Sequence, residues 1–218
     1  PALVNTLIIT ALSLLIAIPF GVFTAIYLVE YAKKGSKIVK LIRITAETLS
    51  GIPSIIYGLF GLLFFCTALK WGYCLLAGAL TLVIMILPLI IRTSEEALLS
   101  VPDAYREASF GLGAGKLRTI FHVVLPTAIP GILSGVILAT GRIVGETAAL
   151  LYTAGSVAKI PNLMGSGRTL AVHMYVLSSE GLYMDQAYAT AVVLLVFVLA
   201  LNGISNLLAK QLTKGRNA

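Results

Sequence analysis

The sequence predicts an all-α membrane protein whose chain crosses the bilayer five times. Three observations support this: few charged residues, five long apolar runs, and basic residues clustered in alternate loops. Of the 218 residues, 58% are hydrophobic and 11% are charged, whereas about a quarter of a soluble domain is charged. Too little polar surface is left to cover a water-facing globule, so the apolar surface is expected to face lipid.

The five apolar runs are each expected to form one membrane-spanning helix. A helix needs roughly 20 largely apolar residues to cross a hydrocarbon core of about 30 Å, and an open strand would leave its backbone hydrogen bonds unmet there. The third run is the shortest. The runs are 3–29, 45–69, 73–91, 128–151 and 187–209.

The start of the chain predicts a missing upstream segment. It begins Pro1-Ala2 without a methionine and enters the first apolar run almost at once. That run is not a signal peptide, because it is too long and no basic segment precedes it.

The basic residues predict the orientation of the chain. Twelve of the 16 fall on one side of the five runs, and three (Lys70, Lys159 and Arg168) fall on the other. Because cytoplasmic loops are enriched in lysine and arginine, the carboxyl terminus is expected in the cytoplasm and the amino terminus outside. The net charge of +7 therefore indicates topology rather than nucleic-acid binding. The twelve are Lys33, Lys34, Lys37, Lys40, Arg43, Arg92, Arg106, Lys116, Arg118, Lys210, Lys214 and Arg216.

Three features lie in or between the first spans. Residues 37–48 are expected to form an amphipathic helix at the membrane surface. The segment 50–54, Ser-Gly-Ile-Pro-Ser, favours a kink in the second span, although such breaks also line substrate routes in some transporters. Cys66 and Cys74 near the outer ends of spans two and three are interpreted as buried thiols rather than a disulfide or a metal site.

Two longer loops follow. The external loop, 152–185, is expected to contain a short helix at 169–177. The cytoplasmic loop, 92–126, is longer than a simple turn requires and reads as helix, turn, helix, with Gly113 in the turn. The second helix is expected to stop at Leu125-Pro126. From the residues alone this loop is an amphipathic connector, a protein-docking element or, least readily, a DNA-binding motif.

A motif within that loop resembles the signature of ABC importer permeases of the MetI-like family. The spacing matches throughout, with a serine in place of the second alanine of Glu-Ala-Ala. The resemblance implies a five-helix permease core, with the loop as the coupling helix seated in a cytoplasmic ATPase. The motif residues are Glu107, Ala108, Ser109, Gly113, Leu125 and Pro126.

The same resemblance implies partners and a location. A bacterial inner-membrane importer of this family comprises a second homologous permease, two copies of the ATPase and an external binding protein. ATP and Mg²⁺ are then used by the ATPase, and this chain has no cofactor. In agreement, it contains no G-x-x-x-x-G-K-[ST] phosphate-binding loop.

Further segments resemble phosphate importer permeases, in particular the PstA-type subunit. They are 51–58, 141–151, 169–173 and 179–181. This resemblance implies phosphate as the transported solute. A permease of the same family for sulfate, molybdate, an amino acid or a peptide is the alternative, and a membrane scaffold without transport is a more distant one.

Arg142 and Glu146 are the candidate residues of the substrate pathway. A charge in the middle of the bilayer costs about 2.5–3.5 kcal/mol on insertion scales, so both should face protein or water. Their spacing of four is expected to place them on one face of a helix, where they can neutralise each other. The pair is either a structural salt bridge or, as we favour, a guanidinium on the anion's route steadied by a carboxylate.

The remaining candidate groups indicate neither a metal site nor catalysis. His122 and His173 have no second ligand at a suitable spacing, and no nucleophile–base pair is evident. The chain is therefore not expected to be an enzyme itself.

Overall fold

The computed structural model describes residues 1–33, 35–181 and 183–214, and within them it contains helices and no strand. The all-α prediction is confirmed. Lys34 and Arg216, which were counted in the charge asymmetry, lie outside the described residues. In chain order the elements are α1 (Ala2–Ile26), η1 (Tyr27–Tyr31), α2 (Lys37–Ser50), α3 (Ser54–Gly61), η2 (Leu62–Ala68), α4 (Leu75–Leu99), α5 (Asp103–Gly111), α6 (Lys116–Thr119), η3 (Ile120–Val124), α7 (Leu125–Val144), α8 (Ala148–Thr153), α9 (Leu170–Glu180) and α10 (Met184–Lys214).

Four helices in the described part of the chain are long and apolar enough to cross a membrane. A fifth crossing exists if α2 and the continuous helix Ser54–Ala68 count as one span, and these two meet at an angle of 101°. The bend lies at Gly51–Pro53, where the kink was expected, because Pro53 has no backbone N–H to continue the helix. The expected span 45–69 therefore contains the end of α2, the break and the helix Ser54–Ala68.

The helix α4 is the centre of the bundle. It was expected to be the shortest span, but it runs for 25 residues. Of its most apolar window 67% is buried, against 33% for the span that contains α1 and 6% for α10. Burial explains the difference from the sequence-based bounds. The polar residues Ser94 and Glu95, which lie beyond the expected end of the run at residue 91, are buried within the protein.

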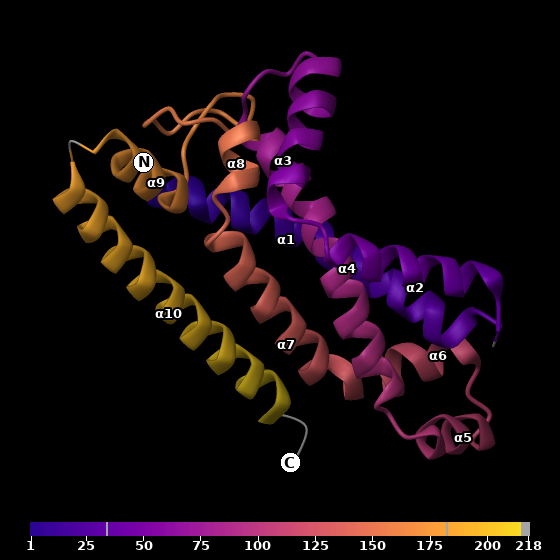
Figure 1. Ribbon diagram of the computed structural model, residues 1–218. Helices are drawn as coiled ribbons and strands as arrows, with labels where there is room; N and C mark the ends of the chain where they lie inside the picture. Colours follow the sequence, from indigo (N-terminus) through magenta and orange to yellow (C-terminus); the bar gives the residue numbers. More distant parts are fainter. Residues whose placement is uncertain (34, 182, 215–218) are drawn as a thin grey trace.

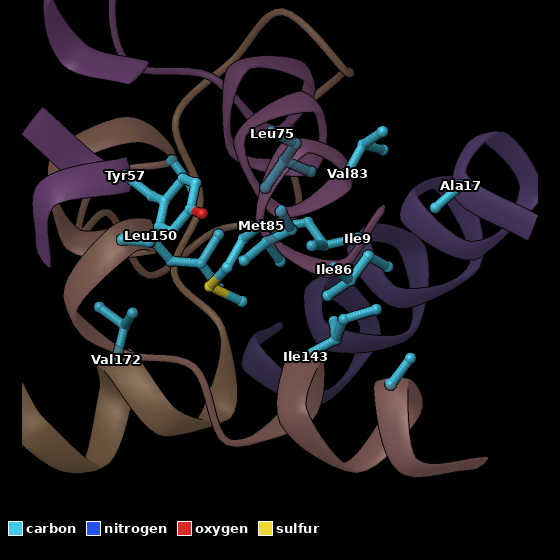
Figure 2. Packing of buried hydrophobic residues seen from close by; sticks show 14 of the residues in the cluster. Ile9, Ala17, Tyr57, Leu75, Val83, Met85, Ile86, Ile143, Leu150 and Val172 are labelled. Atoms are coloured by element: carbon cyan, nitrogen blue, oxygen red, sulfur yellow. The ribbon is translucent and has the colours of Figure 1, made fainter. Parts of the chain in front are cut away.

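The main hydrophobic core joins α4 to helices from both halves of the chain. Figure 2 shows Met85 and Ile86 of α4 beside Ile143 of α7 and Leu150 of α8. At one contact α3 and α8 approach so closely that a Cβ on Gly58 would lie 2.8 Å from the Cα of Ala149. These contacts hold α3, α4, α7 and α8 together in one region of the molecule.

The short helices lie at two ends of the molecule. Figure 1 shows α5 and α6 together at one end, and α8 and α9 at the other, near the amino terminus. The long α10 runs along one flank beside α7. The helix α9 contains the short helix expected at 169–177, and the Thr169 hydroxyl caps it by accepting from the Val172 N–H.

Three segments, η1, η2 and η3, are π-helical turns that continue the helix before them. Such turns insert one extra residue and rotate the side chains that follow, and they are common at functional sites. One of them, η3, lies within the 92–126 loop, and another, η1, contacts that loop, so the backbone departs from a regular helix at both places.

Candidate functional site

The predicted site residues lie in two separate regions. Six of them belong to the 92–126 loop, which projects at one end of the molecule, and Arg142 and Glu146 lie at the far end of α7. The two regions differ in whether their polar side chains have hydrogen-bond partners within the protein.

The helix α5 presents two different faces. Glu107 and Ala108 are exposed on its outer face. Ser109 is buried, and its hydroxyl lies 2.8 Å from that of Thr119 in α6. The serine that replaces the family's alanine therefore joins the two short helices of the loop. The outer face is left free to contact another protein.

Gly113 provides the turn between the two loop helices, as predicted. Its φ is +82°, in the left-handed region that glycine enters without strain. The Gly113 N–H donates to the Phe110 carbonyl at 2.9 Å, and the Ala114 N–H donates to the Ser109 carbonyl at 3.1 Å. These two bonds satisfy carbonyl groups at the end of α5 and reverse the chain.

Leu125 and Pro126 do not stop the second loop helix, and this part of the sequence analysis is wrong. Residues Lys116–Val144 form one continuous helical span. Pro126 lies in the first turn of α7, directly after the π-helical turn η3. A proline inside a helix removes one backbone hydrogen bond, and here it falls where the π-helical turn already interrupts the regular bonding pattern. The helices α6 and α7 are therefore parts of one continuous helix.

The loop also exposes apolar side chains at its tip. Leu112 is 90% exposed, and Tyr105, Phe110 and Leu117 are also exposed. Exposed apolar groups gathered beside charged ones are typical of a protein-docking surface. This tip, together with Glu107 and Ala108, forms an exposed surface of mixed apolar and polar groups.

Arg106 lies next to Glu107 in the sequence but points into the protein. Its guanidinium is bound on every side, and its side chain is only 14% exposed. Nε and Nη2 donate to Glu30 Oε1 at 3.1 and 2.8 Å, while Nη2 also donates to the Leu98 carbonyl at 3.0 Å. Nη1 donates to the Val101 carbonyl at 2.8 Å and to Asp103 Oδ1 at 3.1 Å.

Sequence reasoning missed this contact, because Arg106 was counted only as a topological charge. Two signals pointed to it: an arginine directly before the Glu-Ala-Ser motif, and a lone acidic residue, Glu30, at the end of the first apolar run. A neighbouring contact strengthens the same junction, since the Lys116 Nζ lies 4.8 Å from the centre of the Tyr31 ring.

Arg142 lies in a groove between α4, α7 and α10. The groove is an open cavity of about 580 Å³, which Leu89, Ser134, Gly141 and Asn202 line with Arg142. In the described part of the chain the guanidinium has no hydrogen-bond or ion-pair partner. A cationic fork in an open, mostly apolar groove is a suitable ligand for an oxyanion.

Glu146 does not pair with Arg142, contrary to the sequence-based expectation. The fourth span was expected to run unbroken to residue 151, but α7 ends at Val144, and a turn at 145–147 leads into α8. The buried Glu146 carboxylate accepts from the Ala149 N–H at 3.0 Å, at the first turn of α8. Since the helix ends between the two residues, their spacing of four does not place them on one helical face.

The 152–185 loop is held by the start of α1. Asn5 Nδ2 donates to the carbonyls of Lys159 and Arg168 at 2.8 and 3.1 Å. One turn into α9, the His173 Nδ1 is buried and has no hydrogen-bond partner. Burial, and after it the positive charge of Arg168, lowers the pKa of His173 below its usual value. Within the described residues, no three metal-ligating side chains come together.

Comparison with known sequences identifies one family. A family model described as the binding-protein-dependent transport system inner membrane component matches residues 17–216. The probable ABC transporter permease protein YqgI of Bacillus subtilis is 38% identical, over 97% of this chain and 79% of its own. The phosphate transport system permease protein PstA 1 of Mycobacterium tuberculosis is 41% identical, over 71% of this chain and 50% of its own.

A PstA homolog of Mycoplasma pneumoniae is 38% identical, over 97% of this chain and 34% of its own. The chain thus spans half the length, or less, of these two phosphate permeases. Among solved structures, the MetNI methionine ABC transporter in an inward-facing conformation has a chain with a TM-score of 0.73, at 21% identity over 97% of this chain and 92% of that one. A bacterial alginate importer gives 0.75, at 19% identity over 96% and 78%. These likenesses show a shared fold.

Proposed function

This chain belongs to the family of binding-protein-dependent transport system inner membrane components, and we propose that it is a permease subunit of an ATP-driven phosphate importer. Membership makes it a multi-pass membrane subunit of the ABC importer type, close to the PstA permeases in sequence. The family's name also implies an external binding protein as a partner. The solute and the remaining partners are the proposal.

The observation that carries phosphate as the solute is the unpaired guanidinium of Arg142 in its open groove. A guanidinium offers a planar pair of N–H donors to two oxygens of one phosphate, which a lysine ammonium cannot do. The phosphate permeases among the relatives, at up to 41% identity, support the same solute. In this proposal Arg142 is a transient contact on the anion's route, and the open groove lets the anion leave again.

Glu146 has a supporting part in the proposed pathway. Its carboxylate holds the turn that follows Arg142 by accepting from the Ala149 N–H, and so it fixes the backbone beside the groove. A negative charge near the route also opposes permanent capture of the anion. The role is therefore one of shaping the pathway, and it needs no direct ion pair with Arg142.

The 92–126 loop is proposed to contact the ATPase. Its exposed Glu107 and Ala108, and the apolar tip at Leu112, fit a groove on a partner protein. Two ATPase copies that use ATP and Mg²⁺, a second permease subunit and the bacterial inner membrane complete the proposed assembly, with the carboxyl terminus in the cytoplasm. ATP hydrolysis then belongs to the partner and not to this chain.

Uptake of labelled phosphate tests the proposal in cells that lack the native permease and express the full-length protein with its cognate partners. We expect uptake by the parent, loss with Arg142→Gln, and no change with Arg92→Gln, which removes a guanidinium from an exposed ion pair. Membrane abundance and co-purification of the ATPase should be equal in all three.

Competition by unlabelled solutes separates phosphate from the alternatives. If sulfate, molybdate, an amino acid or a peptide competes and phosphate does not, the chain is a permease of the same family for that solute. The relative YqgI supports this second candidate only in that its name gives an ABC transporter permease without a solute. A parent that binds no ATPase and transports no solute would favour a membrane scaffold.

A further inference from the structure

One side chain, that of Arg106, makes most of the polar contacts at the junction between the 92–126 loop and the transmembrane helices. Arg106 has five N–H donors, and its five hydrogen bonds use them all. Four of the five go to groups outside α5 that belong to two other parts of the chain. These are the Glu30 carboxylate in η1 and the carbonyls of Leu98 and Val101 at the end of α4.

The position of Arg106 on α5 separates this junction from the docking face. Glu107 and Ala108, the next two residues, are exposed, whereas the Arg106 side chain is only 14% exposed and lies against Glu30, whose side chain is 9% exposed. A partner that contacts the outer face of α5 therefore does not reach the guanidinium. A displacement of α5 does reach it, because a forked guanidinium held by five bonds has little freedom to rotate.

The segment that receives the contact is the π-helical end of the first span. The turn η1 is held from both loop helices, by Arg106 on Glu30 and by Lys116 over the Tyr31 ring. It continues α1, which packs along α4 in the centre of the bundle. The loop is thus joined to the first and third spans through these polar contacts and through a hydrophobic cluster in which Ile120 and Val124 pack with Ile26 and Leu98. It is joined to the fourth span through the continuous helix Lys116–Val144.

We propose that Arg106 and Glu30 are positioning residues that carry movement of the ATPase-contacting loop into the first and third spans, separately from the docking of the ATPase itself. This inference rests on the proposed function of the loop. It assigns to the pair neither contact with solute nor contact with ATP. Two sites are involved, the docking face and the groove at Arg142, and the pair provides a physical connection between them.

The test measures the groove directly and needs no knowledge of the solute. Ser134 is exposed and lines the groove, so a cysteine introduced as Ser134→Cys reports its accessibility to a maleimide. The native Cys66 and Cys74 are buried, and the parent without the added cysteine gives the background. The full permease–ATPase complex in lipid nanodiscs is labelled with and without ATP and Mg²⁺.

In the complex that carries only Ser134→Cys, we expect nucleotide to change the labelling rate by about tenfold, a typical coupling between two sites. Glu30→Gln keeps an acceptor of the same shape but removes the ion pair, and Arg106→Lys keeps the charge but not the fork. Both are expected to reduce the nucleotide response to about twofold or less, while the ATPase still binds with about its original affinity.

Asp103→Asn is the matched control, because it alters the one bond of Arg106 that goes to an 85% exposed side chain. It should respond like the parent. If Glu30→Gln and Arg106→Lys also respond like the parent, or if they lose the ATPase, the inference is wrong. A parent whose labelling ignores nucleotide would instead overturn the proposed transport function. Failure of phosphate uptake alone leaves this measurement valid.

Discussion

Arg106 and Arg142 place the same side chain in two contrasting regions of the molecule. Arg106, at the loop end, uses all five N–H donors in hydrogen bonds to the carboxylates of Glu30 and Asp103 and to two backbone carbonyls. Arg142, in the groove beside α10, has no such bond among the described residues. A saturated guanidinium holds parts of a structure together, whereas an unsaturated one in an open groove is available to a ligand. The residue type alone does not distinguish these roles.

The strongest test of this comparison is to replace each arginine with alanine. Arg106→Ala is expected to lower the free energy of unfolding by about 3 kcal/mol, because it leaves the buried Glu30 carboxylate without its partner. Arg142→Ala should lower it by less than about 1 kcal/mol, since the half-buried side chain gives up packing in the groove but no hydrogen bond or ion pair within the described residues. Thermal unfolding of both purified variants in the same detergent measures the difference. Equal losses would show that the two settings are energetically alike.

Glu146 extends the comparison to a carboxylate that binds backbone. Glu146→Ala should destabilise the protein by about 1 kcal/mol, because the Ala149 N–H at the start of α8 loses its acceptor. Glu146→Gln keeps an oxygen in that place and should cost much less. Denaturant titration of the two variants is the measurement. If glutamine were as costly as alanine, the negative charge would be paired with a cation after all.

Ser109 tests the other face of the helix that carries Arg106. Ser109→Ala removes its 2.8 Å hydrogen bond to the Thr119 hydroxyl. It should lower the free energy of unfolding by about 0.5 kcal/mol, less than Glu146→Ala and at the low end for one hydrogen bond. The Thr119 hydroxyl keeps its bond to the Gly115 carbonyl, which limits the loss. Ala108→Ser on the exposed face is the control and should have no effect. A loss as large as that of Arg106→Ala would refute the ranking.

His173, at the opposite end from the loop, is expected to give the smallest effect, one that depends on pH. Its pKa in the folded protein is lowered, so the unfolded chain binds more protons in the window just below the usual value of about 6.5. Stability should therefore be complete above that value and fall as the pH is lowered through the window. Thermal melts between pH 5 and 8, at roughly one-unit steps, should show a slope that His173→Gln reduces. An unchanged slope would assign the pH dependence to other groups.

The sequence predicts the fold class and the loop well, because both depend on local patterns. Apolar runs locate the helices, and Pro102, Gly113 and the Glu-Ala-Ser motif locate α5 and its turn. The broken end of the fourth span was not predictable from periodicity. Its turn at Gly145–Thr147 falls within a largely apolar run, and it is stabilised by a side-chain contact with the backbone that spacing does not reveal.

The Arg106–Glu30 contact was missed for a different reason. The two residues are 76 positions apart, and charge counting assigned Arg106 to topology and left Glu30 unexplained. Long-range polar contacts depend on how helices pack, which a single sequence specifies only through tertiary structure. The π-helical turn that carries Glu30 has no sequence signal of its own either.

The sparse packing of α10 has a consequence for the assembly of the protein in the membrane. Only 6% of its most apolar window is buried, although its mean hydropathy of 2.3 is close to the 2.4 of the spans that contain α1 and α4. A helix of this kind inserts on its own apolar character, and it joins the bundle as a separate, later step. Most of its surface is left for lipid or for a neighbouring subunit to cover.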